Sequence, residues 1–168
     1  RAPVAAVQPQ QPVISQAAWH ANWQREIEGV YLYRELSKAA RTPQMQKLLA
    51  QMAEDENRHA AVWADHMAAA SIDAQQPRPD LRIRMIAWLG RMRGAESVLG
   101  LLINDEVSDI GSYASQAQNL GDTATYQRVL SDETAHARAL ATLRNPEDHT
   151  EPWHRGVNAG GWLREVVY

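Results

Sequence analysis

Cysteine is absent from the chain, which excludes disulfides, thiolate metal sites and redox-active thiols. A metal bound by this protein must therefore be held by oxygen and imidazole ligands. Long apolar runs are also absent, because the best candidate, MIAWLGRMRGAESVLGLLI, is interrupted by Arg91, Arg93 and Glu96. It lacks the roughly 18 uninterrupted apolar residues of a membrane span, so we expect the chain as given to be soluble. The net charge of −3, with scattered basic residues, gives no reason to expect a nucleic-acid partner.

The remaining composition is typical of a globular domain. The chain has 168 residues, of which 45% are hydrophobic and 22% charged, enough for one domain with a buried core. Residues 1–14 are rich in Pro, Gln, Ala and Val without periodicity, which predicts a disordered tail rather than a signal peptide. Residues 146–168 break the helical pattern with prolines and a glycine pair, which predicts a linker. We therefore expect the folded domain to span residues 15–145.

Helix start and stop signals divide the first half of this domain. Ser15 is expected to cap a first helix that ends near residue 40, and Thr42 followed by Pro43 to begin a second that ends near residue 70. Asp80 is expected to cap a short amphipathic helix, with Gly94 as a break or kink after it.

The second half has similar signals. A further helix is expected to reach about residue 119, with Gly121 as its stop signal and Asp122 as the cap of a last helix that ends before Asn145-Pro146. No strand-like alternation is present. The pattern therefore predicts an all-α fold, an antiparallel four-helix bundle with a short extra helix between its second and third helices.

The stretch MAEDENRHAAVW, residues 52–63, places a Glu-x-x-His pair in an alanine-rich helix. Glu56 and His59 are three residues apart and so share a helix face. That face also carries Leu49, Met52 and Trp63, which indicates that the pair points into the core. A single pair of this kind is common on helices, and alone it is weak support for a metal site.

The pair is repeated in LSDETAHARAL as Glu133 and His136, and both copies read Asp-Glu-x-x-His-Ala. Each copy also has a matching glutamate on the helix before it, which is Glu26 for the first copy and Glu106 for the second. The distances from each glutamate to the intervening turn are 16 and 14 residues in the first hairpin, and 15 and 12 in the second. At about 1.5 Å per residue, the two glutamates of each hairpin lie within one turn of the same level. This spacing predicts a duplicated helical hairpin.

Four carboxylates and two imidazoles in a bundle core need compensating charge, since buried charges are costly without partners. Two divalent metal ions would cancel the four negative charges, with carboxylates bridging the ions and each histidine in a terminal position. This ligand set favours iron or manganese over a closed zinc site, and it is the arrangement of the di-iron and di-manganese carboxylate bundles. We therefore predict a two-metal site with six ligands: Glu26, Glu56, His59, Glu106, Glu133 and His136.

Five further residues are expected near this site. Asp55 and Asp132 are natural acceptors for the histidine N–H groups across the bundle, with solvated charge as the alternative. Tyr33 and Tyr113 each follow a predicted ligand by seven residues. This symmetry indicates hydrogen bonds to ligand carboxylates or a radical-quenching role, with ordinary core tyrosines as the alternative. Asp109 is either an additional ligand or a residue outside the ligand set.

Other residues compete for these roles. Glu28 is an alternative to Glu26, but its helical neighbours are polar, whereas Glu26 has Trp23 and Tyr33 on its face. His66 lies seven residues after His59, and we expect a structural histidine there. The remaining histidines lie outside the matched levels and are not expected to be ligands: His20, His149 and His154.

These motifs resemble known families. DENRH and DETAH are similar to the Asp-Glu-x-x-His motifs of bacterioferritins, and EIEGVYLYRELSKAA with AEDENRHA resembles rubrerythrin. Residues 16–144 are similar to the ferritin-like domain of the erythrin–vacuolar-iron-transport family, also called membrane-bound ferritin. The segment WHRGVNAGGWLREVVY resembles the start of the membrane domain in those fusions, so residues 146–168 would lead toward a transporter domain. One departure is the lack of a rubredoxin-type cysteine pair, and with it of the electron relay of full rubrerythrin.

The resemblance implies two iron ions at the six predicted ligands, with manganese or zinc as substitutes. It implies a ferroxidase that oxidises Fe(II) with O2 or H2O2, on the cytoplasmic face of the inner membrane and attached to a membrane iron transporter. The alternative is a regulatory module that senses iron and gates the transporter without turnover. We expect a homodimer, with segment 81–94 as an interface or helix-exchange hinge, and no ferritin-type storage shell.

Overall fold

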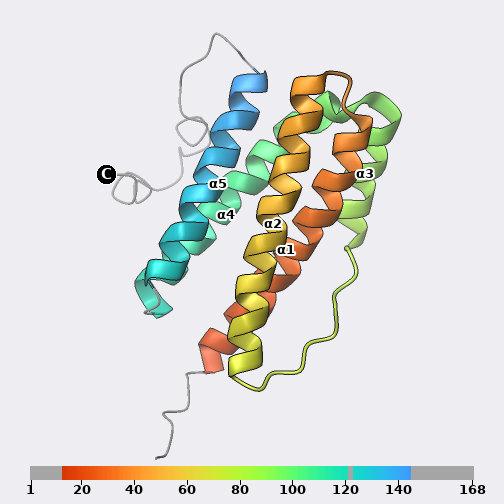
Figure 1. The fold of residues 1–168 in the computed structure, drawn as a ribbon. Helices are drawn as coiled ribbons and strands as arrows, with labels where there is room; N and C mark the ends of the chain where they lie inside the picture. The colour runs from red at the N-terminus through yellow and green to blue at the C-terminus, as the bar shows by residue number, and fades with distance from the viewer. Residues whose placement is uncertain (1–12, 121–122, 145–168) are drawn as a thin grey trace, which may run out of the picture.

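The computed structural model describes residues 13–120 and 123–144, and within these ranges its regular structure is entirely helical. The elements are α1 (Val13–Ala39), α2 (Pro43–Ala69), α3 (Leu81–Arg93), the 3-10 turn η1 (Ala95–Val98), α4 (Leu99–Leu120) and α5 (Thr123–Arg144). Helices α1 and α2 form one antiparallel hairpin and α4 and α5 form the other, while α3 lies along α1 at the edge of the bundle (Figure 1). The all-α bundle with a short extra helix is thus confirmed. None of the described helices is long and apolar enough to cross a membrane.

Two of the predicted helix caps are confirmed by their hydrogen bonds. The Thr42 side chain accepts from the backbone N–H of Met45 at 3.2 Å, and the Asp80 side chain accepts from that of Ile83 at 2.8 Å. Each bond satisfies an N–H group that has no partner inside its helix. The break after α3 is also confirmed, because Gly94 has a φ of 92°, a conformation that side chains other than glycine rarely adopt.

The predicted start of the first helix is wrong. Helix α1 already includes Val13, so Ser15 lies inside the helix and does not cap it. Serine costs at most about 0.7 kcal/mol relative to alanine in a helix interior, so a serine near an expected start does not force the helix to begin there. The predicted tail over residues 1–12, the Gly121 stop, the Asp122 cap and the linker 146–168 lie outside the described residues.

The core consists of two apolar clusters with a polar layer between them. Aliphatic side chains including Leu36, Leu49 and Leu102 fill one end of the bundle. Aromatic side chains including Trp63 and Tyr113 fill the other. Along each of the four long helices the buried residues pass from one cluster to the other, and the buried carboxylates and imidazoles lie at the crossing.

Candidate metal centre

All six predicted ligands lie in the polar layer, and none is more than 5% exposed. Helix α1 contributes one glutamate and α4 another, while α2 and α5 each contribute a Glu-x-x-His pair. The helical spacing of three residues places both members of each pair on the inward face. The structure thus brings together the full set that the sequence analysis predicted: Glu26, Glu56, His59, Glu106, Glu133 and His136.

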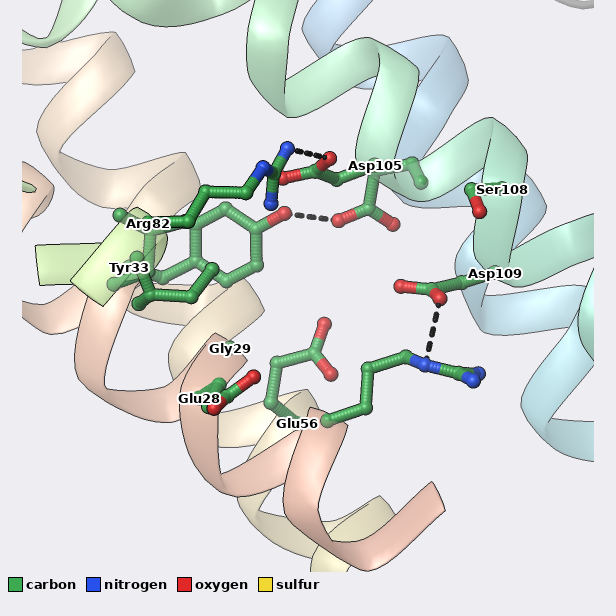
Figure 2. A pocket seen from close by; sticks show the side chains of 12 residues that line it. Glu28, Gly29, Tyr33, Glu56, Arg82, Asp105, Ser108 and Asp109 are labelled. Carbon is green, nitrogen blue, oxygen red and sulfur yellow. Dashed lines mark hydrogen bonds and ion pairs between the residues drawn. The ribbon is translucent and has the colours of Figure 1, made fainter. Parts of the chain in front are cut away.

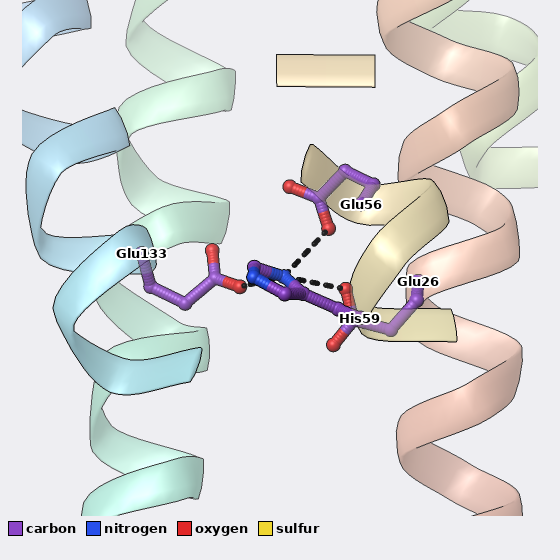
Figure 3. Close-up of side chains that lie close together, drawn as sticks. All are labelled: Glu26, Glu56, His59 and Glu133. Atoms are coloured by element: carbon purple, nitrogen blue, oxygen red, sulfur yellow. Dashed lines mark ion pairs between the residues drawn. The ribbon is translucent and has the colours of Figure 1, made fainter. Parts of the chain in front are cut away.

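These side chains form two overlapping groups of potential metal ligands. One group contains Glu26, Glu56, His59 and Glu133, and Figure 3 shows the His59 ring among these three carboxylates. The second group joins the shared Glu56 and Glu133 to Glu106 and His136. Within each group the ligand atoms lie within 4.8 Å of one another, and no other such group occurs in residues 13–120 or 123–144.

The two imidazole rings are oriented alike. Nδ1 of His59 faces Glu133 at 3.2 Å and Glu26 at 3.6 Å, without hydrogen-bond geometry to either. Nδ1 of His136 lies 3.4 Å from both Glu56 and Glu106, again without a hydrogen bond. A buried nitrogen that faces carboxylates without a hydrogen bond is suited to a cation placed between them.

The opposite ring nitrogens bind the aspartates of the duplicated motif. Nε2 of His59 lies 2.9 Å from Asp132 Oδ2, and Nε2 of His136 lies 3.1 Å from Asp55 Oδ2. Each motif therefore orients the histidine of the other, across the two hairpins. A carboxylate that accepts from one ring nitrogen fixes the tautomer in which the other nitrogen can bind a metal. These are the contacts that the sequence analysis expected for both aspartates.

The two tyrosines also act across the hairpins. The Tyr33 hydroxyl on α1 donates to Glu106 on α4, and the Tyr113 hydroxyl on α4 donates to Glu26 on α1. Burial, followed by the adjacent carboxylate charge, raises the pKa of both phenols well above the ordinary value, so both remain donors. The sequence analysis treated Trp63 as core, and the structure adds a contact of 3.4 Å from its indole N–H to Glu26.

Charge within the cluster is balanced by protons when no metal is bound. Burial lowers the pKa of His59, but the Glu133 and Glu26 carboxylates outweigh this effect and raise it to about 10. Burial raises the pKa of Glu106 to about 8, with repulsion from Glu133 as the next cause. The pKa of Glu56 is raised well above its usual range for the same two reasons. A metal ion must therefore displace protons from this site.

Gly29 gives Glu56 its place and was missed by the sequence analysis. A Cβ atom on Gly29 would lie 3.1 Å from Glu56 Cγ and 3.3 Å from its Oε2, tighter than ordinary contacts. The absence of a side chain one turn after Glu26 therefore lets the Glu56 carboxylate extend between the hairpins. A glycine inside a strongly helical stretch is the signal that could have indicated this close approach.

Residues outside the cluster have other partners. Asp109 forms an ion pair of 3.1 Å with Arg25 and does not join either ligand group. Glu28 accepts from the backbone N–H of Asp80 at 3.1 Å. His66 contacts the Val62 carbonyl at 2.8 Å and packs edge-on against Trp19. His20 is exposed, while His149 and His154 lie outside the described residues.

A pocket of about 210 Å³ reaches the cluster from the α1–α4 side. Tyr33, Glu56 and Glu106 line its inner end, and the ion pairs Arg25–Asp109 and Arg82–Asp105 lie along its wall (Figure 2). Two of the predicted ligands are therefore accessible from this pocket.

The fold and the cluster define a class of protein, the ferritin-like helical bundles with a buried carboxylate–histidine site. Within that class, the rubrerythrin family model matches residues 20–144, and the chain belongs to this family. No curated protein matches the chain significantly, and no solved structure does either. Family membership supports metal binding and a general oxidoreductase role, and rubrerythrin-type domains typically bind iron.

Proposed function

We propose that this domain is a di-iron ferroxidase, which binds two Fe(II) ions and oxidises them with O2 or H2O2. The observation that carries the proposal is the sharing of Glu56 and Glu133 between two buried ligand groups, each with its own histidine. Two shared carboxylates suit two ions held side by side. The donor set of oxygen and imidazole without sulfur suits iron or manganese, with zinc as a substitute.

The protein's own groups prepare the site before iron arrives. Asp55 and Asp132 hold the rings of His136 and His59 with Nδ1 inward. Tyr33 and Tyr113 hold the terminal carboxylates Glu106 and Glu26 from the opposite hairpin. Protein groups held in place by such contacts need little rearrangement when ligands form.

The reaction balances with the two bound ions as substrates. Oxidation of two Fe(II) to Fe(III) releases two electrons, which together with two protons reduce H2O2 to two waters, or O2 to H2O2. Protons displaced from His59 and Glu106 when iron binds supply part of this requirement. The pocket beside Tyr33 and Glu106 offers the oxidant a route to the site.

The finer biological setting is also a proposal. Similarity of the C-terminal sequence to transporter fusions supports a domain that oxidises iron for an attached membrane iron transporter, on the cytoplasmic face of the inner membrane. Metal release from transporter-containing vesicles, compared between the wild type and a Glu133→Gln variant, tests this setting. Equal iron transport by the two would contradict it.

Stopped-flow absorbance after mixing the Fe(II)-loaded domain with O2 or H2O2 tests the ferroxidase proposal. We expect a rapid ferric signal that decreases at least about 100-fold in rate in Glu56→Gln and Glu133→Gln variants, since each removes a ligand of both groups. Glu54→Gln is the matched control, because Glu54 is exposed on the same helix and should leave the rate unchanged. Oxidation in the wild type no faster than in buffer would contradict the proposal.

The alternative function is an iron sensor without turnover. The observation that favours it is that each ligand group contains residues of both hairpins, so metal binding links them. Tight binding of Fe(II), large protection of α5 amides from hydrogen exchange and slow oxidation would together identify the sensor. Fast oxidation that is lost in Glu133→Gln would identify the enzyme.

A further inference from the structure

Helix α3 has apolar side chains on two opposite faces. Its inner face packs on the bundle through Ile83, Ile86 and Ala87, which are at most 8% exposed. The opposite face carries four large apolar side chains that are 56–70% exposed: Leu81, Met85, Trp88 and Met92. Their spacing of four, three and four residues places them in one line along the helix, about 16 Å long. We call these four residues the α3 stripe.

Positive charge borders this stripe. Residues 78–93 contain five arginines and one aspartate, a local charge of 5 − 1 = +4 in a chain whose net charge is −3, so the remainder carries −3 − 4 = −7. The sequence analysis described the basic residues as scattered and missed this concentration. Such a strong local asymmetry of charge is typical of a surface that meets an anionic partner.

Two of the arginines remain available to a partner. The neighbouring acidic groups are already engaged, since Arg82 pairs with Asp105 and Arg91 with Glu35. In the part of the chain that the structure describes, no ion pair involves Arg84 or Arg93, and both are exposed. On the helix, Arg84 lies on one side of the stripe and Arg93 on the other.

We propose that the α3 stripe docks on the surface of a bilayer that contains anionic phospholipids. A helix with an apolar face bordered by arginines lies in the plane of the membrane interface, with its apolar side chains among the acyl chains and its cations near the headgroup phosphates. Trp88 lies within the stripe, and tryptophan is enriched at the depth where apolar and polar layers meet. The position of α3 at the edge of the bundle leaves this face uncovered (Figure 1).

A second copy of the chain fits the stripe less well. Symmetric pairing of two α3 helices would bring two segments of charge +4 together, whereas an anionic bilayer complements that charge. A single line of four side chains is also small against the roughly 800 Å² that each partner contributes to a stable protein interface.

Sedimentation of the purified chain with lipid vesicles tests the proposal. We expect binding to vesicles of phosphatidylcholine with phosphatidylglycerol, weaker binding in high salt, and none to phosphatidylcholine alone. The Arg84→Glu/Arg93→Glu variant should bind at least about tenfold more weakly, because each basic residue near an anionic surface contributes about 1 kcal/mol. Lys47→Glu/Arg128→Glu is the matched control, since it changes the charge equally at exposed positions on α2 and α5.

Two further variants separate membrane docking from other occupants. Trp88→Phe should still sediment with anionic vesicles but lose the quenching of its fluorescence by brominated lipid, which shows that Trp88 enters the interface. Met85→Ser/Trp88→Ser should lose binding, with circular dichroism as the check on folding. Absence of binding to anionic vesicles, or equal loss in both charge variants, would overturn the proposal. A dimer of the wild type that the serine variant converts to a monomer, without lipid binding in either, would assign the stripe to a second copy.

Discussion

Single residues in this site depend on partners from the other hairpin. His59 is oriented by Asp132, and Glu106 receives the Tyr33 hydroxyl. Both contacts could be predicted from the sequence, because the duplicated motif repeats the aspartate and the tyrosine at equal spacing from their ligands. The role of Gly29 could not be predicted, since it depends on how closely α1 and α2 approach each other beside Glu56.

Replacement of Gly29 by alanine tests this close approach. The new methyl group would press on Glu56, whose carboxylate must shift by a few tenths of an ångström. We expect Gly29→Ala to weaken Mn(II) or anaerobic Fe(II) binding about tenfold, as disturbance of ligand positioning commonly does. Calorimetric titration measures the affinity, with Gly111→Ala as the control, since a Cβ atom there has no neighbour within 4 Å. Equal affinities for the two variants would rule out the positioning role.

The metal-free protein should lose stability as the pH rises. The pKa of His59 is about 10 in the folded state against an ordinary 6.5, and that of Glu106 is about 8 against 4.5. Both groups therefore hold protons that the unfolded chain has released, so their stabilising contribution is complete below pH 4.5 for Glu106 and below pH 6.5 for His59. It is lost as the pH rises through 8 and 10, respectively.

Urea unfolding of the metal-free chain at several pH values between 6.5 and 9.5 measures this loss. The free energy of unfolding should decrease over this range, and the decrease should be smaller in Glu106→Gln, which cannot titrate. Mn(II)-loaded protein is the second control, because metal ions replace the protons. A constant or increasing free energy in the metal-free protein would contradict the charge balance described for the cluster.

At the scale of helices, α3 is held on the bundle by a close approach at Gly90. A Cβ atom on Gly90 would lie 2.1 Å from Leu36 Cδ2, and Leu36 is fully buried. We expect Gly90→Ala to destabilise the protein by about 1–2 kcal/mol, because overpacking outweighs the gain in helix propensity. Gly111→Ala should instead stabilise it by about 0.5–1 kcal/mol, since that position has open space. Thermal or chemical unfolding distinguishes the two variants, and stabilisation by Gly90→Ala would contradict the packing of α3.

The helices themselves were largely predictable because their ends carry local signals. Thr42-Pro43 and Asp80 mark helix starts by side-chain hydrogen bonds that need no tertiary contact. Ser15 gave the same local signal without effect, since a serine is compatible with the inside of a helix. The α3 stripe was read only as amphipathic, because hydrophobic periodicity does not reveal that one of two apolar faces is left exposed.

At the scale of the whole molecule, the site connects two hairpins that otherwise meet through packed side chains and a few polar contacts. One such contact is the reciprocal amide pair of Asn22 and Gln116, at 2.8 and 3.0 Å. Metal ions bound between the hairpins would stabilise the folded state by mass action, by about 2.7 kcal/mol at a free metal concentration 100 times the dissociation constant. The centre is therefore expected to be a structural link as well as a reactive site.

Anomalous scattering from crystals of the iron-loaded chain is the most direct test of a two-metal centre. We expect two iron peaks about 3.5–4 Å apart, the separation of two-metal sites in general. One peak should lie beside His59 and Glu26, and the other beside His136 and Glu106, with Glu56 and Glu133 between them. A single peak, or iron bound only outside this polar layer, would contradict the account.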